Sequence, residues 1–353
     1  MDVMSPENSS KTNQVFQVRT GEITQAPNAR QRLVDIVFRK TCYVFTWLTV
    51  ALVAFIVIRI WIAAFPAMRN LGPGFLSGEV WDPNAGKFGI KAEIWGTLYT
   101  SILALVIGSL FGVSAAIFLS EEFLSSTIYK MLKKLKLHHS PAVEKLPTQI
   151  ERLLKELIDL LAAIPSVVYG LWGLYVIIPL IRPYCNWLHE KLGWMPIFST
   201  DLSGPGVLPA VIVLSIMILP TITAISREAF VSVPPKLRMA AYGLGATRWE
   251  SIFAVILPTA ARGIFGGIIL AFGRALGETM ALAMLVGNSN QIRLSLFSPA
   301  NTLAALLANN FPEAGPKEVG ILMYAALVLL AITLTVNIIG SVILNRAGLM
   351  QAE

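Results

Sequence analysis

Six long apolar runs constrain the fold of this 353-residue chain more than any other feature. Each holds roughly 18 or more residues with few charges, which is long enough to cross a bilayer as a helix. The runs lie near residues 41–65, 94–120, 157–181, 207–226, 264–286 and 319–344. Because backbone groups in hydrocarbon must be hydrogen-bonded internally, runs of this length favour helices. The sequence therefore predicts an all-α integral membrane protein with six transmembrane helices.

The distribution of basic residues predicts how these spans are oriented. The formal net charge of +7 could indicate a nucleic-acid-binding protein. If the six runs span a membrane, however, 19 of the 28 Lys and Arg residues fall on one side and 7 on the other. The positive-inside rule then places both termini in the cytoplasm. We therefore expect the basic excess to set topology and attract lipid headgroups, with no nucleic acid partner.

The segments outside the spans have distinct compositions. Residues 1–30 are polar and aperiodic, which predicts a disordered cytoplasmic N-terminus, and residues 31–350 should form the six-span domain. Within that domain, residues 121–156 read as two amphipathic helical pieces separated near Pro141. We expect this cytoplasmic insertion to lie on the inner leaflet or on a partner. In the third run, Pro165 predicts a kink.

The loop at 227–263 has a pattern that predicts a projecting knob. A Pro-Pro pair should end the preceding helix, and a strong helix former follows it. Gly243 and Gly245 interrupt that helix, and the pattern resumes over 246–257 and should end at Pro258. Two short helices around a glycine-rich turn, held between two spans, would suit docking into a groove on another protein.

This loop resembles the cytoplasmic signature of the membrane subunits of ABC importers. That signature begins Glu-Ala-Ala, with Gly at the seventh place and Leu-Pro at the nineteenth and twentieth. The matching residues here are Ala240, Ala241, Gly245, Leu257 and Pro258, whereas Met239 stands in place of the Glu. The resemblance implies a type I ABC importer permease fold and a helix that docks on an ATP-hydrolysing subunit. The docking residues it implies are Ala240, Ala241, Gly243, Gly245, Arg248 and Trp249.

Two further motifs narrow the resemblance. LLAAIPSVVYGLWGL in the third run and FGRALGETM in the fifth resemble the PstC-type permeases of phosphate importers, over roughly residues 35–345. The resemblance implies a multi-pass subunit of the plasma (inner) membrane that moves inorganic phosphate into the cytoplasm. Its implied partners are a second, PstA-like phosphate permease, a dimer of ATP-binding subunits and an extracytoplasmic phosphate-binding protein. An ABC permease for molybdate, sulfate or phosphonate is the alternative.

The chain has no G-x-x-x-x-G-K-[ST] loop. We therefore expect no cofactor in this chain, and expect ATP and magnesium to bind to the partner subunit. No His and no paired carboxylates lie in the six runs, and no metal-ligand spacing occurs. We thus expect a transporter subunit, not an enzyme, with no metal site. A self-sufficient channel or secondary transporter is a further alternative, which predicts uptake without an ATPase partner.

An arginine and a glutamate interrupt the fifth run. Each charge near the bilayer centre costs roughly 2.5–3.5 kcal/mol on insertion scales. Residues three and four apart share a helix face, so Gly267, Ala271, Arg274 and Glu278 are predicted to form one stripe. In one interpretation, Arg274 and Glu278 form a closed ion pair that fixes helix packing. In the other, Arg274 offers its guanidinium to a passing phosphate and Glu278 holds it when the path is empty.

Hydroxyl groups nearby could add to this substrate pathway. Ser166 and Tyr169 flank the predicted kink, and Thr279 follows Glu278. Each hydroxyl could donate a hydrogen bond to an oxyanion. The candidate pathway is therefore Arg274, Glu278, Thr279, Ser166 and Tyr169.

Overall fold

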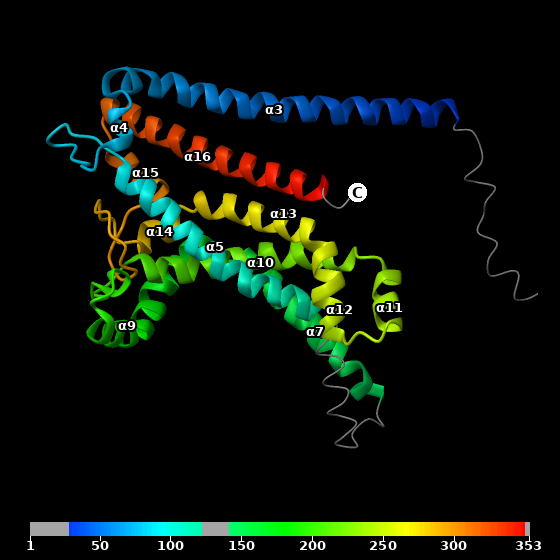
Figure 1. Ribbon diagram of the computed structural model, residues 1–353. Helices are drawn as coiled ribbons and strands as arrows, with labels where there is room; N and C mark the ends of the chain where they lie inside the picture. The colour runs from blue at the N-terminus through cyan, green and yellow to red at the C-terminus, as the bar shows by residue number, and fades with distance from the viewer. Residues whose placement is uncertain (1–27, 122–140, 350–353) are drawn as a thin grey trace, which may run out of the picture. The chain divides into compact units, whose positions relative to one another are not determined.

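The computed structural model describes the backbone of residues 28–121 and 141–349, and the side chains of residues 28–121 and 149–346 (Figure 1). Within these ranges the extended pairings are two isolated bridges, Asp82 with Lys87 and Gly287 with Ala300. The α-helices are α3 (Ala29–Leu71), α4 (Gly74–Ser77), α5 (Lys91–Ser120), α7 (Pro141–Ala163), α8 (Ser166–Trp172), α9 (Ile178–Leu192), α10 (Val207–Val231), α11 (Pro235–Gly243), α12 (Arg248–Ser251), α13 (Leu257–Leu276), α14 (Met280–Leu285), α15 (Leu303–Asn310) and α16 (Pro316–Leu349). Two π-helical turns, η2 (Gly173–Ile177) and η4 (Ile252–Ile256), and two 3-10 turns, η3 (Pro196–Phe198) and η5 (Phe311–Glu313), connect them.

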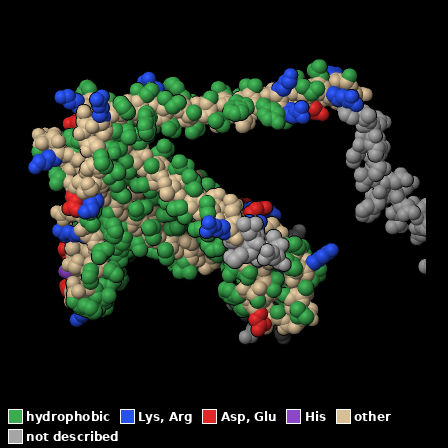
Figure 2. Space-filling model, turned by 45° about the horizontal axis from the view of Figure 1, so that its top comes forward, with side chains coloured by type: hydrophobic (Ala, Val, Ile, Leu, Met, Phe, Trp, Pro, Cys, Tyr) green, Lys and Arg blue, Asp and Glu red, His purple; other side chains and the backbone are tan. Residues whose placement is uncertain are grey.

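Six helical segments are long and apolar enough to cross a membrane, which confirms the six predicted transmembrane helices. They are Ala29–Leu71, Lys91–Ser120, Ser166–Leu192, Val207–Val231, Arg248–Leu276 and Pro316–Arg346. On the face drawn in Figure 2, hydrophobic side chains cover the sides of the helices and charged ones gather near helix ends. That distribution suits a hydrocarbon environment around the helices.

The chain divides into two compact units at Arg59. In the first unit, the described part is the start of α3, whose side chains are almost all exposed. Of the segment 1–30 that was predicted to be disordered, residues 1–27 lie outside the described residues. The helix α3 begins at Ala29. The second unit contains the rest of the chain and holds the functional residues discussed below.

The fourth span, α10, is the centre of the second unit. It is the most buried of the six spans, with 61% of its apolar window inside the protein. Glycines on α5 let the two helices approach closely: a β-carbon on Gly108 would lie 2.8 Å from Cγ1 of Ile218. One turn later, the hydroxyl of Thr223 donates to the carbonyl of Gly112 at 3.1 Å. Side chains of α10 thus lie directly against the backbone of α5 at Gly108 and Gly112, and the two helices form one closely packed pair.

The third span begins later than its apolar run. We expected Pro165 to kink a helix that starts near residue 157, but the helix stops at Ala163 and restarts at Ser166. Pro165 has an extended backbone (φ −60°, ψ 141°) and lacks the amide hydrogen that would continue the hydrogen bonds of α7. The amphipathic α7 is thus a separate element. The first half of the predicted insertion lies outside the described residues.

Two π-helical turns each precede a proline by two residues. η2 precedes Pro179 and η4 precedes Pro258. We predicted that the helix resuming over 246–257 ends at Pro258, and this is wrong. The helix begins at Arg248 and passes through η4 into α13, so that Pro258 occupies the first turn of α13. The wider turn accommodates a residue that lacks an amide hydrogen.

Candidate functional site

The fifth apolar run is interrupted at residues 277–279, which we call the break. α13 stops before Gly277 and α14 starts after Thr279. The hydroxyl of Thr279 donates to the carbonyl of Gly277 at 3.1 Å. Oε1 of Glu278 accepts from the amide of Ala281 at 3.4 Å. Two polar side chains of the GETM motif therefore bind backbone groups that the interruption frees.

One of the two interpretations, a closed ion pair between Arg274 and Glu278, is wrong. It required a continuous helix, and the break lies between the two residues. The ion pairs among the described side chains join other residues, Lys91 with Glu79 and Arg238 with Glu121. The small-residue face predicted for α13 is also displaced: Gly267, Ala271 and Ala275 are buried, whereas Arg274 is exposed. Arg274 therefore lies beside the packed stripe and not on it.

Arg274 borders a pocket between three spanning helices. The pocket has a volume of about 350 Å³. Its lining residues come from α10, α13 and α16, and they are Thr221, Leu270, Gly273, Arg274, Thr333 and Asn337. Asn337 approaches α13 closely, since a β-carbon on Gly273 would lie 3.3 Å from its Oδ1 atom. The pocket thus brings one arginine together with three neutral side chains that can form hydrogen bonds. Sequence reasoning did not assemble this group, because its members lie on helices that are far apart in the sequence.

The third span is packed against the segment that follows the break. A β-carbon on Gly170 would lie 3.4 Å from Cα of Ala281, so α8 and α14 are in close contact. Tyr169 is buried on α8. Its hydroxyl donates to the carbonyl of Leu161 at 2.8 Å and so spans the interruption at Pro165. The donor of Tyr169 therefore already has an acceptor.

Ser166 is half-buried at the first position of α8. Of the five predicted pathway residues, Glu278 and Thr279 bind the backbone at the break. Among the described residues, no group of three or more His, Cys, Asp or Glu side chains is arranged to hold a metal ion. Arg274 is accordingly the residue of this set that offers a charged donor.

The second candidate region is the knob, residues 235–251, which lies at the opposite end of the bundle from α9, α14 and α15 (Figure 1). Gly245 has a φ of +87°, a conformation that favours glycine, and it turns the chain between α11 and α12. A capping box starts α12: the amide of Glu250 donates to the Thr247 hydroxyl at 3.3 Å, and the amide of Thr247 donates to the Glu250 carboxylate at 2.7 Å.

The knob exposes large apolar side chains. Ala241 is the one residue of α11 that is buried, while Leu244 is 91% exposed. Met239, Tyr242 and Trp249 are also exposed, as are the predicted docking residues Ala240, Gly243, Gly245 and Arg248. An apolar surface on a projecting loop is typical of an interaction site. Sequence reasoning selected the small residues of the motif and missed Leu244, whose position between two glycines was the available signal.

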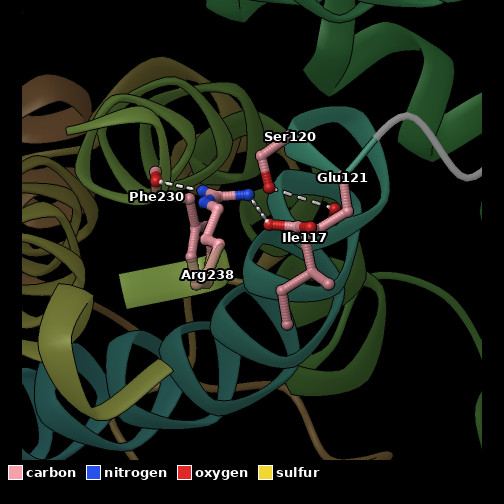
Figure 3. A network of polar contacts seen from close by, with 5 residues as sticks. All are labelled: Ile117, Ser120, Glu121, Phe230 and Arg238. Carbon is pink, nitrogen blue, oxygen red and sulfur yellow. Dashed lines mark hydrogen bonds and ion pairs between the residues drawn. The ribbon is translucent and has the colours of Figure 1, made fainter. Parts of the chain in front are cut away.

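The base of the knob is fixed by Arg238, which sequence reasoning did not select. Figure 3 shows its guanidinium between the ends of α5 and α10. Nη1 forms an ion pair with Glu121, and Nη2 donates to the carbonyl of Phe230 at 2.7 Å. No local pattern could have indicated this pair, because Glu121 and Arg238 are 117 residues apart.

Comparisons with known proteins agree with this architecture. Residues 144–347 match the family described as "Binding-protein-dependent transport system inner membrane component". The phosphate transport system permease protein PstC of Haemophilus influenzae is 36% identical over 321 residues, which cover 90% of this chain and 95% of that protein. The probable phosphate transport system permease protein PstC of Methanocaldococcus jannaschii is 34% identical over 291 residues, covering 80% and 85%.

Among solved structures, the fold is similar to a chain of the MetNI methionine ABC transporter in an inward-facing conformation. The TM-score is 0.51 at 15% identity, over 73% of this chain and 95% of that one. This likeness concerns the fold alone. The family match and the relatives above show that the chain belongs to the inner membrane components of binding-protein-dependent transport systems, and within them to the PstC permease family.

Proposed function

We propose that this chain is the membrane permease subunit of an ATP-driven ABC importer, and that it moves inorganic phosphate into the cytoplasm across the plasma membrane. Membership of the PstC family supports the substrate. The observation that carries the mechanism is the exposed Arg274 beside the break in an apolar run. Irregular backbone and a guanidinium are costly against lipid, so this face should border a polar path or another subunit.

Arg274 would bind the translocated anion. Its fork of N–H donors can contact two phosphate oxygens at once. The three neutral polar side chains of the pocket, Thr221, Thr333 and Asn337, can replace part of the hydration shell. Because a single guanidinium faces the pocket, affinity should stay low enough for the ion to leave. Glu278 and Thr279 would act indirectly, by keeping the break in its present geometry.

The knob supports the proposed assembly. Its exposed apolar side chains suit docking into a groove of an ATP-binding subunit, which would bind ATP and magnesium as a dimer. A second, PstA-like permease would complete the path, and an extracytoplasmic phosphate-binding protein would deliver the substrate. In this arrangement the knob and both termini lie in the cytoplasm. The chain itself would hydrolyse nothing.

Uptake of labelled phosphate by cells that depend on this chain tests the proposal. We compare the native chain with Arg274→Gln, Arg274→Lys and Glu278→Gln, and measure the amount of each in the membrane. Arg262→Gln is the matched control, because it removes a positive charge from an exposed position of the same helix. We expect Arg274→Gln to abolish uptake at native membrane levels and Arg262→Gln to leave it unchanged. Normal uptake by Arg274→Gln would remove Arg274 from the path.

Another oxyanion is the remaining alternative, because a guanidinium fork fits any tetrahedral anion of similar size. Competition by molybdate, sulfate and phosphonate in the same uptake assay separates the candidates. We expect excess unlabelled phosphate to suppress uptake far more than the other three anions do. If the native chain moves one of those anions and not phosphate, the family assignment holds and the substrate changes.

A further inference from the structure

We propose that Arg238 fastens the knob to α5, and that this attachment transmits knob movement through α5 to the opposite end of the bundle. The proposal rests on the proposed function, since it assigns a coupling role within an ATP-driven importer. Arg238 is a positioning residue in this scheme and does not contact the substrate. Four contacts carry the argument: two that Arg238 makes, one to the end of α5 and one to the end of α10, and two near the other end of α5.

The guanidinium joins two helix ends at once (Figure 3). Glu121 directly follows the last residue of α5, and Phe230 lies in the last turn of α10. The final carbonyls of a helix lack intrahelical donors, and the C-terminal end carries partial negative charge. A cation therefore suits both ends, and only a planar fork can serve the two acceptors together. Arg238 thus connects α11 to the most closely packed helix pair of the bundle.

The attachment is shielded from water. The side chain of Arg238 is 21% exposed and that of Glu121 is 7% exposed. Removal of either partner leaves a largely buried, uncompensated charge, which is strongly unfavourable. Ala241 is buried on the same helix. Arg238 therefore links the docking surface to the spanning helices through a largely buried ion pair.

The other end of α5 forms hydrogen bonds with the first residue of α15 and with the segment that precedes this helix. The Thr97 hydroxyl accepts from the amide of Leu303 at 2.9 Å. The Tyr99 hydroxyl donates to the carbonyl of Leu294 at 2.7 Å. α5 has 30 residues and no internal proline, whereas α3 and α10 contain Pro66 and Pro220. An uninterrupted helix of about 45 Å thus links the knob to residues 294–303.

The expected phenotype of a broken attachment is uncoupling. The ATP-binding subunit could still dock on the exposed knob and hydrolyse ATP. The knob would then move without carrying α5, and the opposite end would open less often. Transport per ATP should fall, whereas a purely structural role would lower assembly, ATP hydrolysis and transport together.

We would measure phosphate uptake and ATP hydrolysis in vesicles that contain the complete transporter. The variants are Arg238→Gln, Glu121→Gln and the double variant. Arg262→Gln is the control, since it removes a positive charge from an exposed position of α13, outside the knob. We expect each single variant to lower phosphate moved per ATP about tenfold, a typical size for coupling between sites. The double variant should be no worse than the single ones, because all three lose the same interaction.

Charge exchange keeps the test decisive if a single variant fails to assemble. Glu121→Arg combined with Arg238→Glu should restore assembly and part of the coupling. Arg238→Lys should retain less than half of the native ratio of phosphate to ATP. An unchanged ratio of phosphate to ATP in variants that assemble would overturn the proposal, as would an equal effect of Arg262→Gln. No phosphate uptake by the native assembly would instead overturn the phosphate assignment. The two failures are therefore distinguishable.

Discussion

The two ends of α5 are held in different ways, although each carries an ion pair. At the first end, Lys91 and Glu79 lie 2.6 Å apart with side chains 50% and 59% exposed. At the second, the Arg238–Glu121 pair is largely buried. Lys91 also has the unfavourable sign for a helix N-terminus, whereas Arg238 has the favourable sign for a C-terminus. The first end depends on several neutral hydrogen bonds and the second on one largely buried ion pair, so a single change can release the second end more easily.

The largest effect should come from Gly96→Ala, at the first end. A β-carbon there would overlap the carbonyl oxygen of Asn301, which is backbone and cannot turn aside. We expect destabilisation of about 3 kcal/mol or more, and loss of the chain from the membrane. Gly266→Ala is the control, because its β-carbon would meet nothing within 4 Å. Normal membrane levels of Gly96→Ala would show that the first end is not rigid.

Thr97→Val should have the next largest effect. Valine preserves shape but leaves the buried amide of Leu303 without an acceptor, at a cost of about 1–3 kcal/mol. Thr97→Ser keeps the hydroxyl. Thermal unfolding in detergent should therefore rank native above Thr97→Ser and Thr97→Ser above Thr97→Val. Equal stability of the two variants would assign the contact to packing and not to the hydrogen bond.

In the knob, which Arg238 attaches to the second end of α5, Gly245→Ala should reduce transport without changing the six spanning helices. Alanine at a φ of +87° costs about 1–2 kcal/mol, which the turn can relieve by changing the direction of α12. We expect uptake to fall several-fold while membrane levels stay native. Gly243→Ala, two residues earlier at the end of α11, should have no such effect, since its β-carbon meets nothing and its φ is not positive. Equal effects of the two variants would contradict a conformational role for Gly245.

The smallest effect should come from Lys91→Gln. An exposed ion pair contributes little, so stability should change by about 0.5 kcal/mol or less. Thermal unfolding and the phosphate-to-ATP ratio should both remain native. A loss of coupling as large as that expected for Arg238→Gln would show that the two ends do not differ in the way described.

Sequence reasoning predicted the six spans and the knob because each depends on local pattern. The length of an apolar run identifies a membrane span, and prolines and glycines mark the ends and the turn of the knob. It missed the break at 277–279, because GRALGETM has residues that a helix also accepts. It also missed the pocket around Arg274 and the Arg238–Glu121 pair, which depend on how distant helices pack. Local pattern thus located the functional segments, and tertiary packing determined which side chains meet.

The π-turn η4 has a consequence for chain length. A π-turn is an α-helix with one inserted residue, so it rotates everything before it by about 100° relative to everything after it. Deletion of one residue within Ile252–Ile256 would restore an ordinary helix. The span would still be long and apolar, but Trp249 would point in another direction. The orientation of the docking surface therefore depends on the number of residues in this turn as well as on their identity.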